Sequence, residues 1–203
     1  MAKTIINNVL TQLFILVCIL IIINAVVRMK INKTESVYVK SELNGKEYFV
    51  QNMPDKDEAA YILSVIDEKI NIMKRYFAAN VDRYPKYRKY IEQFLTKTNN
   101  LLLYENAIDS AYTSYTVNKG EETVLCLRSN HNGNLHDINL ITYVTLHEMA
   151  HIACPELDHT DLFKDIFKFF ITTAVNLGIY KNINYQIDPK EYCGLIINEN
   201  LVK

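Results

Sequence analysis

The stretch "LHEMAHIACPELDHTDLF", residues 146–163, contains three of the five histidines in the chain. Within it, "HEMAH" places His147 and His151 four residues apart. Residues with this spacing project from one face of a helix, so both imidazoles can bind the same ion. Glu148 lies beside them, and in HExxH sites this glutamate does not bind the metal but takes a proton from water. The pattern therefore predicts a zinc site on a helix.

Catalytic zinc usually has three protein ligands and one open position. His159 is the natural third ligand, because Pro155 ends the helix and the residues after it can turn the chain back to the ion. The carboxylates of Glu156 and Asp158 are alternatives. Cys154 is a further alternative, although it lies on the helix away from the two histidines.

Two other histidines, His131 and His136, lie in the polar loop "SNHNGNLHD". We expect them to be solvated loop residues, and either could approach the cleft. Asp137 at the end of this loop is a good helix N-cap.

Residues 9–27, "VLTQLFILVCILIIINAVV", contain no charged side chain. At about 1.5 Å per residue, a run of about 19 residues covers roughly 28 Å, close to the thickness of a bilayer core. We therefore expect residues 1–33 to be a transmembrane anchor with a basic flank. A cleaved signal peptide fits less well, because the run is long and no clear A-x-A site follows it.

The charges around this run predict its orientation. Lys3 precedes it, whereas Arg28, Lys30 and Lys33 follow it closely. The positive-inside tendency then places the C-terminal body in the cytosol, as part of a single-pass membrane protein.

The composition limits the classes of function. The chain has 203 residues, 49% of them hydrophobic, which is enough for a domain with a real core. Its net charge of −1 argues against a broad basic surface, so no nucleic-acid partner is expected. Cys126, Cys154 and Cys193 show no paired spacing, and we expect them to be reduced, buried thiols.

Residues 34–203 alternate between strand and helix signals, which predicts an α+β domain. Asn44-Gly45 and Asn118-Lys119-Gly120 each indicate a hairpin, and residues 123–128 form the second arm of the latter. Amphipathic helices are expected after Pro54 and over residues 87–97.

The C-terminal part of the body has similar signals. A helix is expected over residues 138–153, and an apolar helix capped by Thr160 or Asp161 is expected to close at Gly178. A further strand is expected near residues 194–197.

The histidine stretch resembles the WLM-type zinc metallopeptidases, relatives of the SprT/Spartan group. Their pattern is HExxH, a short turn, a third histidine and then a phenylalanine, and it is matched by His147, Glu148, His151, His159 and Phe163. The segments "SYTVNKGEETVLCLR" and "EYCG" are similar to the versions found as stand-alone proteins in large DNA viruses. The turn after the second histidine is two residues longer than in many cellular members.

The resemblance implies a zincin-like fold, with a small sheet, an active-site helix and supporting helices behind the N-terminal anchor. It implies Zn²⁺ held by His147, His151 and His159, with Glu148 as general base. A virion or a host membrane is then a natural location. The cellular relatives cleave DNA-crosslinked proteins and carry DNA-binding or partner-binding tails. We expect no such tail here and the chain is not basic, so we do not carry that substrate over.

The leading expectation is a membrane-anchored zinc peptidase acting on protein or peptide substrates. Residues 123–128 would bind extended peptide by strand addition. Tyr115, Tyr192 and His136 are candidates for a transition-state hydrogen-bond donor. The alternative is a catalytically inactive, zinc-stabilised, membrane-bound interaction module. A nucleic-acid-associated protease is disfavoured by the charge balance.

Overall fold

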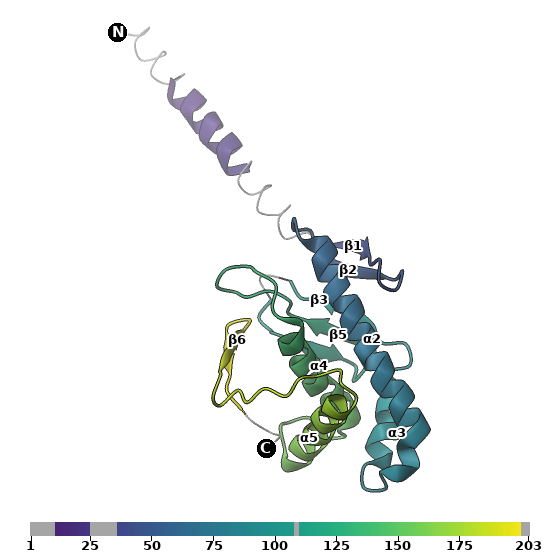
Figure 1. The fold of residues 1–203 in the computed structure, drawn as a ribbon. Coiled ribbons are helices and arrows are strands. Elements are labelled where there is room, and N and C mark those ends of the chain that lie inside the picture. Colours follow the sequence, from purple (N-terminus) through teal and green to yellow (C-terminus); the bar gives the residue numbers. More distant parts are fainter. Residues whose placement is uncertain (1–10, 25–35, 108–109, 200–203) are drawn as a thin grey trace, which may run out of the picture. The chain divides into compact units, whose positions relative to one another are not determined.

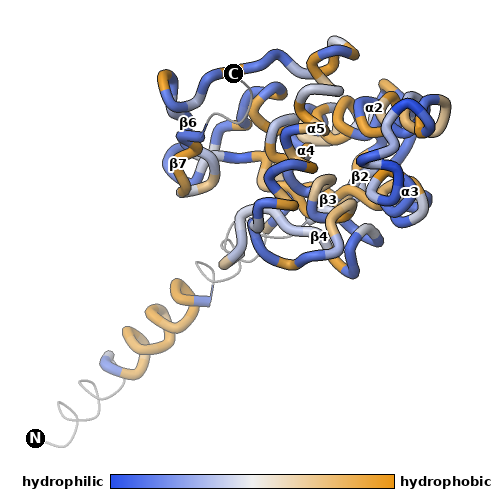
Figure 2. Tube along the Cα trace, turned by 90° about the horizontal axis from the view of Figure 1, so that it is seen from below, coloured by the Kyte–Doolittle hydropathy of each residue, from blue (hydrophilic) through white to orange (hydrophobic). Residues whose placement is uncertain are grey.

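The computed structural model describes residues 11–24, 36–107 and 110–199. The chain divides into two compact units, Met1–Glu35 and Ser36–Lys203 (Figure 1). In the first unit, residues 11–24 form a helix that is mostly hydrophobic along its length (Figure 2), and most of its apolar side chains are exposed. No helix in the described ranges is both long and apolar enough to span a bilayer. The predicted span, residues 9–27, and its basic flank extend into segments outside the described residues.

The second unit is built on a five-stranded sheet in the order β1-β2-β3-β5-β4 (Figure 1). β1 and β2 are antiparallel, β2–β3 and β3–β5 are parallel, and β5 and β4 are antiparallel. The strands are β1 (Ser36–Lys40), β2 (Glu47–Gln51), β3 (Leu102–Glu105), β4 (Tyr115–Val117) and β5 (Glu122–Leu125).

Both predicted hairpins are confirmed. The first joins β1 to β2, and Gly45 adopts a φ of 70° at its turn, as the Asn44-Gly45 signal requires. The second joins β4 to β5 through Asn118 and Lys119.

The prediction that residues 123–128 form the strand available to a peptide is wrong. β5 lies between β3 and β4 and is hydrogen bonded on both sides. Within the described residues, β4 has one neighbour in the sheet, so β4 is an edge strand, as is β1 at the other end.

Two helices connect the parallel strands β2 and β3. They are α2 (Lys56–Asn80) and α3 (Arg88–Lys97), joined by a short 3-10 helix at Val81–Arg83. The apolar side of α2 packs on the strands, with Ile62, Leu63 and Ile66 buried in the core. These helices agree with the predictions from Pro54 onward and over residues 87–97.

The helix α4 (Ile138–Ala153) lies at the centre of the unit. It contacts α2, α3, α5, β4 and β5, and most of its side chains are buried (Figure 1). The side chain of Asp137 accepts hydrogen bonds from the backbone N–H groups of Asn139 and Leu140, so the predicted N-cap is confirmed.

The helix α5 (Asp161–Asn176) packs along α4. Its N-cap is Thr160, whose hydroxyl accepts from the backbone N–H of Phe163, and Gly178 ends it with a φ of 71°. This matches the predicted start and stop.

The C-terminal hairpin contains β6 (Lys190–Tyr192) and β7 (Leu195–Ile197). A disulfide joins Cys193 in its turn to Cys126, which directly follows β5. The expectation of reduced thiols is therefore wrong for this pair, because the fold brings together two cysteines that are 67 residues apart. Cys154 is free and buried, as expected.

Candidate metal centre

Three imidazoles converge at one point of the second unit. The Nε2 atoms of His147 and His151 are 3.1 Å apart, those of His151 and His159 are 3.2 Å apart, and those of His159 and His147 are 3.0 Å apart. Among the described residues, these three histidines form a group whose ligand atoms are close enough together to hold one metal ion.

The spacing of the three nitrogens suits one shared ion. Ligands about 2.0–2.1 Å from a tetrahedral zinc ion lie about 3.3 Å from one another, and the three observed distances fall just below this value. Three neutral imidazoles also form the ligand set that zinc accepts in catalytic sites, with a fourth position open. The donor set therefore fits the metal that the sequence predicts.

The three histidines lie at the end of α4 and at the start of α5. His147 and His151 lie one turn apart near the end of α4, which stops at Ala153 ahead of Pro155. His159 directly precedes Thr160, the N-cap of α5. His159 therefore lies at the junction between the turn after α4 and the capped start of α5.

Phe163 supports all three imidazoles from the first turn of α5. Its ring stacks on His151 at a centroid distance of 4.1 Å and meets His147 and His159 at 5.0 and 4.9 Å. Phe167 contacts His147 edge-on at 5.1 Å. The imidazoles are thus backed by aromatic packing that limits their rotation.

Burial keeps two of these imidazoles neutral. It lowers the pKa of His147 to about 3 and, together with nearby positive charge, lowers the pKa of His151 to about 4. A neutral imidazole has a free lone pair for a metal, so these residues are ready to bind at neutral pH.

The carboxyl group of Glu148 is deeply buried, with a relative exposure of 6%. Burial raises its pKa to about 7, while a hydrogen bond from Thr116 Oγ1 at 3.1 Å opposes this change. A carboxyl group with a pKa near neutrality can both accept and return a proton. A cation held by the three imidazoles would lower this pKa by favouring the carboxylate.

These groups line one cavity of about 800 Å³, within the range of small-ligand sites. Its walls come from the edge strand β4, the helices α4 and α5, the turn after α4, and the C-terminal hairpin. Tyr192 contributes to it from β6, and its hydroxyl is hydrogen bonded with that of Ser114 at 2.7 Å.

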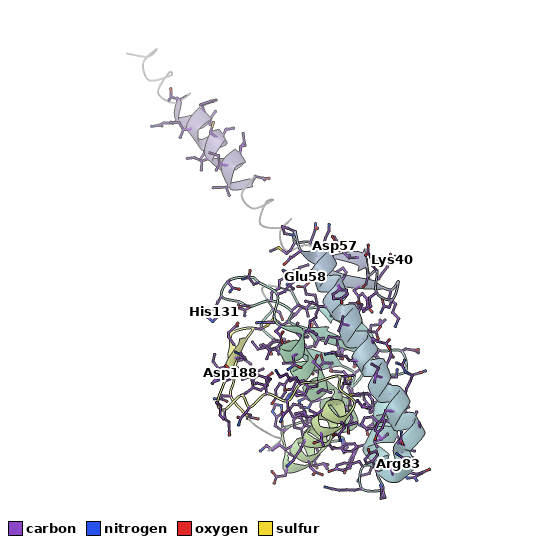
Figure 3. The ribbon with its side chains drawn as sticks, viewed as in Figure 1. Lys40, Asp57, Glu58, Arg83, His131 and Asp188 are labelled. Carbon is purple, nitrogen blue, oxygen red and sulfur yellow. A yellow bond between two sulfur atoms is a disulfide. The ribbon has the colours of Figure 1, made fainter. Side chains whose placement is uncertain are left out.

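Of the other candidate residues from the sequence, Tyr115 lines the cavity, whereas the following ones have other partners or lie elsewhere. The carboxylate of Glu156 accepts from the hydroxyl of Thr160, and Cys154 is buried at the end of α4. His136 packs on the ring of Tyr192 at 5.1 Å, and burial lowers its pKa. His131 is exposed on the loop after β5, where Figure 3 labels it at the periphery.

Two residues of the site were missed by the sequence reasoning. Thr116 contacts Glu148 from β4, and Lys119 contacts the turn after α4 from the β4–β5 hairpin. The hairpin signal identified their local structure, but their contacts depend on strand order, which local patterns do not encode.

No family profile matches the chain. The chain is 52% identical over 195 residues to protein R325 of Acanthamoeba polyphaga mimivirus, covering 95% of this chain and 99% of that protein. It is 27% identical over 165 residues to protein 136R of Invertebrate iridescent virus 6, covering 76% and 85% of the two chains.

Among solved structures, the chain is similar to Wss1 from Saccharomyces cerevisiae, at 18% identity and a TM-score of 0.46, over 64% of this chain and 89% of that one. The sequence identity to the mimivirus protein, over nearly the full length of both chains, establishes the family of this chain. The chain belongs to the family of viral proteins that includes mimivirus protein R325.

Proposed function

We propose that the second unit is a zinc-dependent peptidase. The observation that carries the proposal is the convergence of three imidazole nitrogens within 3.2 Å of one another on the wall of a cavity that also contains the buried carboxyl group of Glu148. The resemblance of residues 146–163 to WLM-type metallopeptidases supports the same assignment.

His147, His151 and His159 would hold the zinc ion. The ion supplies Lewis acidity, which polarises a carbonyl oxygen and lowers the pKa of water. Glu148 then acts as the general base that takes a proton from the attacking water and gives it to the leaving amine. The hydrogen bond from Thr116 orients its carboxylate.

The edge strand β4 would bind the peptide. Its outer side is unpaired within the described part of the sheet, and Ser114, Tyr115 and Thr116 line the cavity. A substrate strand added to β4 would pass the carboxylate of Glu148. We therefore propose protein or peptide substrates bound in an extended conformation.

The test compares purified wild-type protein with the Glu148→Gln variant. Both should contain one zinc ion per chain by elemental analysis, because glutamine does not alter the three ligands. The wild type should cleave an unstructured protein such as casein, and the variant should lose at least about a hundredfold in rate. A wild type without zinc would contradict the proposed metal site.

The same comparison tests the inactive interaction module. Zinc in both proteins with no difference in any cleavage would favour a structural metal over a catalytic one. The intact Glu148, buried beside the imidazoles with a pKa near 7, favours catalysis.

We also propose that residues 9–27 attach the protein to a membrane. The charge-free sequence supports this, as do the exposed apolar side chains along helix 11–24. Flotation of the full-length protein with lipid vesicles tests it, and a protein that stays at the bottom of the gradient would contradict it.

The proposed cytosolic location of the body rests on the flanking charges. The Cys126–Cys193 disulfide is more typical of oxidising compartments and opposes it. Digestion by an added protease in intact membrane vesicles would distinguish the two sides.

A further inference from the structure

The turn that carries His159 is held by side-chain contacts and not by backbone hydrogen bonds, within the described residues. Residues 155–159 are all exposed, and Leu157 has a relative exposure of 80%. None of these residues forms a backbone-to-backbone hydrogen bond with another described residue. Neither core packing nor a hydrogen-bonded ladder therefore fixes the path from the end of α4 to the third histidine.

Lys119 holds this turn from outside. Its ammonium group donates to the backbone carbonyl oxygens of Cys154 at 3.1 Å and Pro155 at 2.9 Å, and reaches that of Glu156 at 3.5 Å. An ammonium has three N–H donors, so one side chain can bind three successive carbonyls. The first of these carbonyls belongs to the C-cap of α4, where a positive charge is also favourable.

Lys119 has a backbone conformation that residues with a side chain rarely adopt. Asn118 and Lys119 have φ values of 48° and 53°, and the N–H of Gly120 donates to the carbonyl of Val117 at 3.1 Å. Such a turn favours glycine at its second central position, because side chains with a Cβ rarely adopt this conformation. The chain instead has a lysine there, aimed at the turn that leads to His159.

We propose that Lys119 is a positioning residue for the metal site, which acts by fixing the turn so that His159 reaches the ion. This inference rests on the proposed zinc site. In the cavity, Lys119 thereby links the edge strand that would bind the peptide to the loop that completes the ligand set.

The charge of Lys119 and its positioning role predict opposite effects on zinc affinity. A zinc ion and an ammonium group repel each other, so loss of the positive charge alone would strengthen zinc binding. Loss of the three carbonyl contacts would release the turn and weaken it. The sign of the change therefore distinguishes the two roles.

The experiment measures the zinc dissociation constant of full-length protein by competition with a chromogenic chelator. Lys119→Met removes the donors at similar length, and Lys119→Arg keeps them. Lys164→Met removes an exposed cavity lysine whose ammonium group makes no hydrogen bond to the turn in the described part of the chain. We expect Lys119→Met to weaken zinc binding about 10-fold to 100-fold, the range for residues that orient metal ligands. Lys119→Arg should stay within about threefold of wild type, and Lys164→Met should not weaken binding.

A second pair of variants isolates the route through His159. In the His159→Ala background, Lys119→Met should not weaken zinc binding further, because the ligand it positions is absent. An equal loss in both backgrounds would show that Lys119 does not act through His159. If Lys119→Met fails to fold, Lys119→Gln replaces it, with an expected loss smaller than tenfold and still absent in the His159→Ala background.

The outcomes separate this inference from the proposed function. If wild-type protein binds no zinc, both fail. If wild-type protein binds zinc and Lys119→Met binds it equally or more tightly, the positioning role fails and the proposed function stands.

Discussion

The chemistry of single residues in this protein depends on burial. Glu148 and His147 lie next to each other on α4, and the same desolvation raises the pKa of the carboxyl group to about 7 and lowers that of the imidazole to about 3. Both shifts favour the uncharged form. The proposed role of Glu148 in proton transfer depends on this burial.

Replacement of Thr116 by valine tests how the base is oriented. The variant keeps the shape of the side chain but removes the hydrogen bond to Glu148. Because a hydrogen bond to a charged group contributes about 1.5–3 kcal/mol, we expect the rate of peptide cleavage to fall about tenfold or more, with zinc content unchanged.

The matched control is Thr172→Val on the exposed face of α5, whose hydroxyl donates to the carbonyl of Lys168. It should cleave at the wild-type rate. A Thr116→Val protein that also cleaves at that rate would show that this hydrogen bond does not serve catalysis.

At the scale of elements, the sequence predicts those features that are encoded locally. Asp137 and Thr160 cap α4 and α5 as expected, and the two predicted hairpins form around their turn residues. The spacing of His147 and His151 predicts a shared face because both lie on one helix. His159 could be suggested but not placed, since its position depends on contacts made by a distant lysine.

Features set by long-range pairing could not be read from local patterns. The alternation in residues 123–128 indicates a strand, but its central place follows from its parallel pairing with β3. In the same way, the spacing of Cys126 and Cys193 gave no sign of a bond that forms only when the C-terminal hairpin folds back beside β5.

The disulfide should anchor the C-terminal hairpin that forms one wall of the cavity. Replacing both Cys126 and Cys193 by serine should lower the free energy of unfolding by about 2–4 kcal/mol, because the bond closes a long loop. Zinc content should not change, since all three proposed ligands lie outside the hairpin. Urea unfolding of the full-length protein measures the effect.

A reducing agent provides the control for that variant. It should destabilise the wild type by a similar amount and leave the double variant unaffected. Equal stability of the wild type with and without the reductant would contradict the anchoring role.

At the scale of the whole second unit, one ion network joins the sheet to α2. Arg128, which follows β5, contacts Glu105 of β3 at 2.7 Å and Asp55 at the start of α2 at 2.6 Å. Glu105 also accepts from the backbone N–H of Gln51 in β2. Three strands and a helix are thus tied together through one buried guanidinium group.

Replacement of Arg128 by methionine should destabilise the protein in a pH-dependent way. It leaves the buried carboxylate of Glu105 without its cation, which costs about 3–5 kcal/mol at pH 7. Burial already raises the pKa of Glu105, and Arg128 opposes this rise. Without Arg128 the native state holds a proton that the unfolded chain releases, so stability falls as the pH rises above the ordinary value of 4.5.

The destabilisation should therefore be larger at pH 7 than at pH 4.5, measured as the shift in the urea midpoint. Arg75→Met is the matched control, because Arg75 pairs with Glu68 on the surface and its loss should have little effect. A shift for Arg128→Met that is equal at both pH values would contradict the role of the buried Glu105.

The most direct test of the account is a crystal structure of the zinc-loaded protein, with anomalous scattering recorded on both sides of the zinc absorption edge. We predict one zinc peak, about 2.0–2.1 Å from the Nε2 atoms of His147, His151 and His159. An ion bound instead through Glu156 or Asp158, or no zinc peak at the three imidazoles, would contradict it.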